Sequence, residues 1–351
     1  MITTTIENKD REYITLIRGI SITRVVLVHL GLSWIFIPYS EYIHVFLPLL
    51  FFVSGAVSQF SFSRAKSPLL YLKKRLISVA IPYYTVVIIS FAISSLIQWE
   101  LPTFDPFLIY NWATFNAVEV RSSMPFPLGQ IWFLHSLVII LIFSPILFFL
   151  SERNSTVLPL VIILSLAIGV TQQITNFGKD LFFLNHNMYQ PLSNVGFFAF
   201  GAFFYKYRYI FTQKMLGSTL MAFLLLSVAS GLWFSDSMFM TRHTFAPDIF
   251  YISCNYSAIL LFLVLQDQVT WLVEKIPGAH YFFLFMSKHS YSVFLLHSLV
   301  LYICHHFLGL DGVMGDPLRA GFKIILVITI TCLISIPVTK LTNKVVLTLQ
   351  K

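Results

Sequence analysis

Besides Arg24, two ionisable side chains, Arg18 and His29, lie in an apolar stretch over residues 14–37. They are eleven residues apart, which at about 100° per residue puts both on one helix face, about 16 Å apart along the axis. A guanidinium is a permanent cation that can hold an anion, and an imidazole can accept and return a proton. Because a charge inside a bilayer is costly, such residues commonly mark a function. We therefore interpret Arg18 and His29 as a pair that lines a passage, with Arg18 nearer the cytoplasm.

Each residue also has a structural interpretation when it is taken alone. An arginine near the end of a span can extend to the headgroups, and an intramembrane histidine can hydrogen-bond to a neighbouring helix. The shared face favours the functional interpretation for Arg18 and His29. Arg24 is rotated by about 120° from that face. We expect it to pair with a carboxylate or to reach the headgroups rather than to take part in catalysis.

The composition is typical of a membrane protein with many helical spans. The chain has 351 residues, of which 57% are hydrophobic and 11% are charged, and its mean hydropathy is +0.80. These values exclude a soluble domain, and repeated apolar runs of about 18–25 residues indicate transmembrane helices. We predict an all-α polytopic membrane protein that forms one transmembrane domain over residues 1–351, with no appended soluble domain.

About ten segments are apolar enough to be predicted as transmembrane helices. Their approximate bounds are 14–37, 44–62, 76–98, 130–150, 156–174, 192–205, 214–234, 250–268, 283–308 and 320–342. With the N-terminus inside, most of the 23 Lys and Arg residues fall on the cytoplasmic side. This asymmetry predicts that both termini are cytoplasmic. The net charge of +8 is then a topology signal, and we expect no nucleic-acid partner.

The longest connection, residues 99–129, is predicted to face outward. Its prolines and aromatic residues indicate an ordered cap or a re-entrant segment, with an ordinary surface loop as the alternative.

The three cysteines, Cys254, Cys304 and Cys332, lie in apolar runs without pairing or metal-ligand spacing. The Cys-His-His run at 304–306 also lacks the i, i+4 spacing of helical metal ligands. We therefore predict free thiols and no metal site.

Five short segments, in this order along the chain, share a pattern. They are IRGISITRVVLVH (17–29), LPLLFFVSGAV (47–57), YLKKRLISVAIPYY (71–84), GQIWFLHSLV (129–138) and SKHSYSVFLLHSLV (287–300). Together they resemble the membrane-bound acyltransferase-3 family, in which an Arg is followed after ten residues by a His. The matching positions are Arg18, His29, Phe51, Phe52, Ser54, Gly55, Arg75, Pro82, Trp132, Phe133, Leu134, Ser290, Tyr291, Leu296 and His297. Each segment alone is weak evidence for the family, but five segments in the order of the family are strong evidence.

The resemblance implies an integral membrane O-acyltransferase. Such enzymes move an acyl group, usually acetyl, from cytoplasmic acyl-CoA to a hydroxyl of an extracytoplasmic cell-surface glycan. His29 would act as general base or carry the acyl group briefly, and Arg18 would bind the donor or stabilise an oxyanion. Lys73, Lys74 and Arg75 would receive the phosphates of the donor. The family often has a further Arg three residues after the one that matches Arg75, and here Ser78 stands there.

Four other residues are expected to bind substrate or to serve the structure. His297 lies deep enough to face the same passage as His29, although a structural hydrogen bond is the preferred expectation. Tyr291 lies on a different helix face from His297. Trp132 fits an aromatic belt or a contact with the acceptor sugar. Ser54, beside a glycine, is expected to permit close helix packing and not to be a nucleophile.

Two other functions fit part of the pattern. A transporter or flippase for a lipid-linked glycan would also have buried Arg and His residues, and so would a glycan polymerase. The order of the five segments favours the acyltransferase over both. The partners implied are acyl-CoA, a lipid-linked or polymeric glycan and the lipid bilayer, with acyl-CoA as substrate and no bound cofactor. The expected location is the bacterial cell inner membrane.

Overall fold

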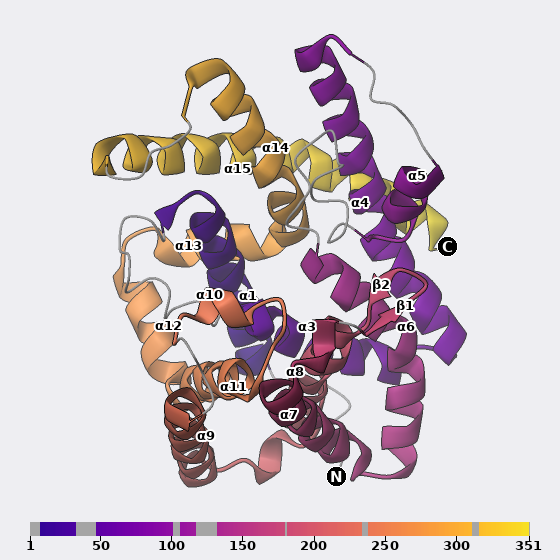
Figure 1. Cartoon of the computed structure of the whole chain (residues 1–351), viewed down its shortest axis with the longest axis vertical. Coiled ribbons are helices and arrows are strands. Elements are labelled where there is room, and N and C mark those ends of the chain that lie inside the picture. Colours follow the sequence, from indigo (N-terminus) through magenta and orange to yellow (C-terminus); the bar gives the residue numbers. More distant parts are fainter. Residues whose placement is uncertain are drawn as a thin grey trace. The chain divides into compact units, whose positions relative to one another are not determined.

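The computed structural model describes residues 8–32, 47–100, 106–116, 132–179, 181–233, 238–310 and 316–350 (Figure 1). The longer helices are α1 (Asn8–His29), α3 (Leu47–Ser63), α4 (Pro68–Gln98), α6 (Trp132–Arg153), α7 (Val157–Thr175), α8 (Tyr189–Lys206), α9 (Gln213–Trp233), α11 (Ile249–Val264), α14 (Ser290–Leu308) and α15 (Pro317–Leu349). The shorter helices are α5 (Pro106–Ala113), η3 (Phe177–Lys179), η4 (Arg208–Ile210), α10 (Met240–His243), α12 (Gln266–Lys275) and α13 (Ala279–Lys288). The strands β1 (Phe182–Phe183) and β2 (His186–Asn187) form an antiparallel pair.

The all-α membrane architecture is confirmed, but the count of about ten spans is not. Among the described residues, six helices are long and apolar enough to cross a membrane, namely α4, α6, α7, α9, α14 and α15. A seventh span results if α11 and α12, which are bent by 71° at their junction, count as one.

The other predicted spans do form helices, and their composition explains why they fall short. α1 carries charged side chains along its length, and α3 has 17 residues. α8 contains buried polar side chains such as Gln190 and Asn194. Because most residues of α3 and α8 are buried against other helices, these helices do not need the uniformly apolar surface that lipid demands.

The described chain divides into two compact units. Unit 1 comprises residues 1–21, 37–71 and 143–287, and unit 2 comprises residues 22–36, 72–142 and 288–351. α1, α4, α6 and α13 contribute residues to both.

In unit 1, α3 and α8 approach each other through reciprocal glycines. A Cβ added to Gly55 would lie 1.9 Å from the carbonyl oxygen of Phe198, and one added to Gly201 would lie 1.9 Å from that of Phe52. The two helix backbones can come this close only because Gly55 and Gly201 have no side chain. Gly55 therefore has the packing role that the sequence suggested, and Ser54, beside it, is half-buried.

In unit 2, hydrogen bonds fix α4 against α14 and α5. The Tyr291 hydroxyl of α14 donates to the Val79 carbonyl of α4 at 2.8 Å. The hydroxyls of Tyr83 and Tyr84, near the middle of α4, donate to the carbonyls of Trp112 and Ala113 at the end of α5. Figure 1 shows α5 beside α4. The described part of the long connection is thus an ordered segment that folds back along α4, whereas residues 101–105 and 117–131 lie outside the described residues.

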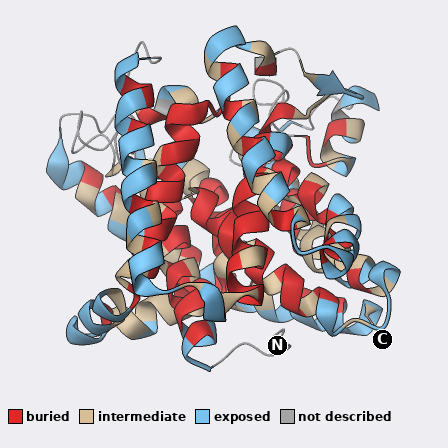
Figure 2. Cartoon of the chain, turned by 90° about the horizontal axis from the view of Figure 1, so that it is seen from below, coloured by how far each residue is buried: buried red, intermediate tan, exposed pale blue. Residues whose placement is uncertain are grey.

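Several helices present apolar side chains outward. On α9, Leu225, Val228 and Leu232 share one face and are 66%, 58% and 72% exposed. In Figure 2, helices are red along their buried side and pale blue along their exposed side. Contiguous apolar surface of this kind is unfavourable in water and favourable against lipid tails.

Candidate active site

His29 and His297 meet in unit 2. The Nδ1 atom of His29 lies 2.7 Å from the Nε2 atom of His297. The ring centroids are 5.0 Å apart and the ring planes are within 9° of parallel. Nearly parallel rings with nitrogens 2.7 Å apart and centroids 5.0 Å apart cannot be stacked face to face. They meet edge to edge, with the hydrogen bond near their common plane. This histidine pair joins the end of α1 to the middle of α14.

The hydrogen bonds determine which nitrogen carries each proton. His297 Nδ1 lies 3.3 Å from the Val293 carbonyl, which can only accept, so His297 carries its proton on Nδ1. In the neutral ring its Nε2 is then an acceptor, and His29 must donate from Nδ1. In that tautomer, Nε2 is the unprotonated nitrogen of His29. A proton taken there would give an imidazolium whose Nδ1–H is already bonded to His297.

The two rings differ in exposure. His297 is fully buried, and His29 is exposed. Two aromatic rings lie beside His297: Phe294 of α14 is 6.1 Å from its ring, and Phe133 of α6 packs on Phe294 at 5.8 Å. A fixed, buried partner and an accessible base form the arrangement that general-base catalysis requires. The sequence suggested that His297 faces the same passage, but only the structure brings the two histidines into contact.

Trp132 and Tyr291 both have positions that serve the packing of helices. Trp132 is the first residue of α6 and is 8% exposed, so its indole is packed inside the protein instead of lying on an outer belt. The Tyr291 hydroxyl is bonded to Val79, so Tyr291 holds α14 against α4.

Arg18 lines a cavity in unit 1 between one face of α1 and one face of α3. The cavity volume is about 290 Å³, and the lining residues are Arg11, Ile14, Thr15, Arg18, Val57, Phe60, Ser61 and Arg64. The four residues of α1 recur at i, i+3, i+4 and i+7, which is one helical face, and Val57, Phe60 and Ser61 of α3 are followed at the same spacing by Arg64, just after the end of α3. We call this the arginine cavity. The eight described lining residues comprise three arginines and no carboxylate, so the cavity suits an anion.

The arginine cavity contains residues that the sequence interpretation missed or assigned elsewhere. Neither Arg11 nor Arg64 was predicted to line a site with Arg18. The i, i+7 spacing of Arg11 and Arg18 was a usable signal, but the contribution of α3 needs tertiary structure. Arg18 and His29 lie on one continuous helix, with Arg18 in unit 1 and His29 in unit 2.

The predicted donor-binding residues Lys73, Lys74 and Arg75 lie in the first part of α4. Lys73 and Lys74 are exposed and Arg75 is half-buried. The Gln350 amide at the end of α15 donates to the Lys74 carbonyl and to the Ser78 hydroxyl, both at 2.9 Å. Ser78, which replaces the second family arginine, thus takes part in tying α15 to this basic segment.

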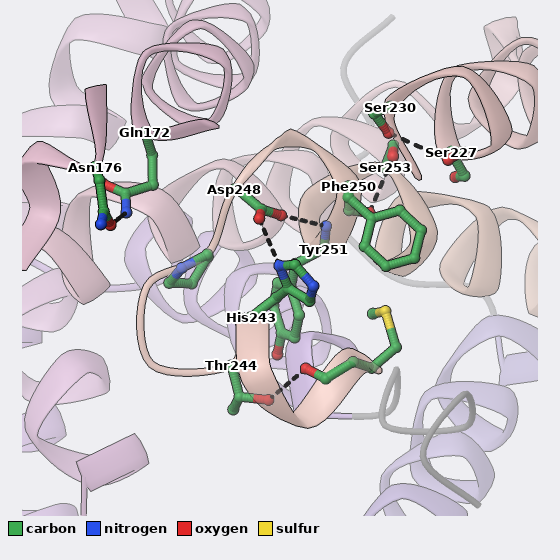
Figure 3. Close-up of polar contacts among 12 residues, drawn as sticks. Gln172, Asn176, Ser227, Ser230, His243, Thr244, Asp248, Phe250, Tyr251 and Ser253 are labelled. Carbon is green, nitrogen blue, oxygen red and sulfur yellow. Dashed lines mark hydrogen bonds and ion pairs between the residues drawn. The ribbon is translucent and has the colours of Figure 1, made fainter. Parts of the chain in front are cut away.

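A second histidine contact lies in unit 1, away from the predicted residues. His243 Nδ1 is 2.5 Å from Asp248 Oδ2, and Asp248 Oδ1 accepts from the backbone N–H of Tyr251 at 2.9 Å (Figure 3). Asp248 therefore caps α11 while holding α10, which is a structural role. Among the described residues, no group of three or more His, Cys, Asp or Glu side chains is placed to hold a metal ion.

Comparison with known proteins gives one match. The family model of the acyltransferase-3 family, described as an acyltransferase domain, matches residues 11–338. No curated protein and no solved structure matches the chain. The matched range includes the histidine pair and the arginine cavity.

Proposed function

Because the chain belongs to the acyltransferase-3 family, we propose that it moves an acyl group, acetyl in the first instance, from cytoplasmic acyl-CoA to a hydroxyl of an extracytoplasmic cell-surface glycan. Family membership makes the chain a membrane acyltransferase. The donor, the acceptor, the direction of transfer and a bacterial inner-membrane location are the proposal.

The histidine pair carries this proposal. Acyl transfer to an alcohol needs a base that removes the hydroxyl proton as the oxygen attacks the acyl carbon. The Nε2 atom of His29 has the required lone pair and the ring is exposed, while His297 fixes its orientation from the buried side. The arrangement resembles in its logic a serine–histidine–carboxylate triad, in which the inner partner sets the tautomer of the outer base.

The proposed step balances as follows. The acceptor hydroxyl oxygen forms a bond to the thioester carbonyl carbon, and His29 Nε2 takes the hydroxyl proton. The tetrahedral intermediate then breaks its carbon–sulfur bond, and the proton passes from His29 to the departing sulfur of CoA. The products are an O-acyl ester and free CoA thiol, and His29 returns to its neutral form.

The arginine cavity supports acyl-CoA as the donor. CoA carries phosphates, and guanidinium groups bind phosphate oxygens by charge-assisted, often bidentate hydrogen bonds. A volume of about 290 Å³ is at the lower end of the range for small-molecule sites. The cavity therefore fits a phosphate-bearing part of acyl-CoA and not the whole molecule. Lys73, Lys74 and Arg75 remain proposed donor contacts.

The test is acyl transfer from radiolabelled acetyl-CoA in membranes that contain wild type, His29→Ala or His306→Ala at matched protein levels. His306 is an exposed histidine on the same helix as His297 and serves as the control. We expect labelled glycan with wild type and His306→Ala, and a loss of at least about 100-fold with His29→Ala.

Two other results would change the account. If wild type transfers no label but its expression alters glycan export or chain length, the transporter or polymerase interpretation replaces the enzyme. If label accumulates on the protein when acceptor is omitted, and His29→Ala abolishes that label, His29 carries the acyl group and is not only a base.

A further inference from the structure

Asn111 is a fully buried amide near the end of α5. Its Oδ1 accepts from the Asn116 side-chain amide at 3.1 Å, and its backbone carbonyl accepts from the Asn116 N–H at 2.8 Å. Asn116 thereby fixes the orientation of the Asn111 amide. The Nδ2 atom of Asn111 is buried and has no hydrogen-bond partner among the described residues. A buried donor of this kind is costly, and a native structure that retains one calls for an explanation.

Contacts within unit 2 connect the end of α5 and the helix that bears His297 to the same part of α4. α4 and α14 touch at two points, Val79 with Tyr291 and Gln98 with Tyr302. Along α14, His297 lies between Tyr291 and Tyr302.

Along α4, the residues that contact the end of α5 lie between Val79 and Gln98. Tyr83 and Tyr84 bond to the carbonyls of Trp112 and Ala113, and the Phe91 ring lies 6.2 Å from the Trp112 ring. Asn111 immediately precedes Trp112. It is therefore held beside the part of α4 that lies between the two hydrogen bonds to α14, and His297 lies between the same two bonds on α14.

The face of α4 that turns to α5 is unusually polar. Ser90 and Ser94 lie seven and eleven residues after Tyr83, which puts all three within about 20° of one helix face. Both hydroxyls are buried and lack partners among the described residues. Serines in a helix normally bond back to the preceding turn, so unpartnered ones indicate a polar path along this side of α4.

Acyl transfer needs a donor for the negative charge that develops on the thioester oxygen, and neither ring of the histidine pair supplies it. We propose that Asn111 Nδ2 donates a hydrogen bond to that carbonyl oxygen as it becomes an oxyanion. The inference rests on the proposed function. When the hydroxyl oxygen attacks, the carbonyl electron pair moves to oxygen opposite Asn111 Nδ2, and it returns when the carbon–sulfur bond breaks.

The test compares Asn111→Asp, Asn111→Ser and Asn111→Ala for kcat and for KM of acetyl-CoA, with thermal stability of the purified protein as a second readout. Asp keeps the oxygen that accepts from Asn116 but replaces the donor, and Ser restores a donor in a smaller side chain. Asn343→Asp, at an exposed site on α15, is the matched control. We expect kcat to fall about 100- to 1,000-fold for Asp and Ala, with KM within a few-fold. Ser should recover about tenfold over Ala.

Three results would overturn the inference. Asn111→Asp and Asn111→Ala could keep kcat within about threefold of wild type, or kcat could fall only in proportion to thermal stability. Asn111→Ser could also be no better than Ala, which would show a packing role. In each case wild type still transfers label, so the proposed function survives. An inactive wild type would instead remove the proposed function and this inference together.

Discussion

The arginine cavity of unit 1 and the histidine pair of unit 2 are built from opposite kinds of side chain. The cavity gathers three permanent cations, two of them exposed, on two helix faces, with no carboxylate among its described lining residues. The histidine pair joins two imidazole rings, one of them fully buried, through one hydrogen bond. Permanent charge at an accessible surface suits binding of an anion, whereas a ring that can gain and lose a proton suits chemistry. The contrast therefore separates donor binding from proton transfer.

Among the variants that test this division between donor binding and proton transfer, His297→Ala is expected to have the largest effect on kcat. We expect His297→Ala to lower kcat about 100-fold and leave KM for acetyl-CoA within about threefold, because His29 loses the partner that fixes its tautomer. His297→Gln, which can accept through its side-chain oxygen, should retain more activity than Ala. The measurement is steady-state acyl transfer at matched protein levels. An unchanged kcat for His297→Ala would show that the contact serves only packing.

A smaller effect is expected in the arginine cavity. Arg18→Ala and Arg64→Ala should each raise KM for acetyl-CoA about tenfold with kcat within a few-fold, because they remove binding that is equal in the ground and transition states. Lys at either position should restore part of the affinity. Added salt should weaken binding to wild type more than to the variants. Donor titrations at two salt concentrations measure this. A fall in kcat at constant KM would place Arg18 in the chemistry instead.

The smallest effect concerns the support of the histidine pair. Tyr291→Phe removes the hydroxyl that bonds to Val79, which we expect to cost about 1 kcal/mol of stability. Transfer should stay within about threefold of wild type, because the hydroxyl faces α4 and not His297. Thermal unfolding in detergent, together with the transfer assay, tests both statements. A loss of 100-fold without a change in stability would mean that Tyr291 contacts a substrate.

The sequence predicted what lies along one helix better than what lies between helices. Arg18 and His29 share a face because helical periodicity is local, and each of the ten predicted segments is largely helical over its described residues. The span count failed because burial inside the protein allows α3 to be short and α8 to be polar.

The contact of His29 with His297 and the cavity shared by Arg18 and Arg64 bring together residues far apart in the chain, so no spacing reveals them. The sequence allowed three interpretations of the segment that contains Asn111: an ordered cap, a re-entrant segment and a surface loop. Its importance depends on where α4 and α14 place the end of α5.

The central claim is that His29 and His297 act as one catalytic unit, and a double-mutant cycle tests it most directly. Acyl transfer would be measured for wild type, His29→Ala, His297→Ala and the double variant at matched protein levels. Residues that act as a unit give non-additive losses, so we expect the double variant to be no slower than His29→Ala alone. Losses that multiply, with the double variant about 100-fold slower than His29→Ala, would contradict the account.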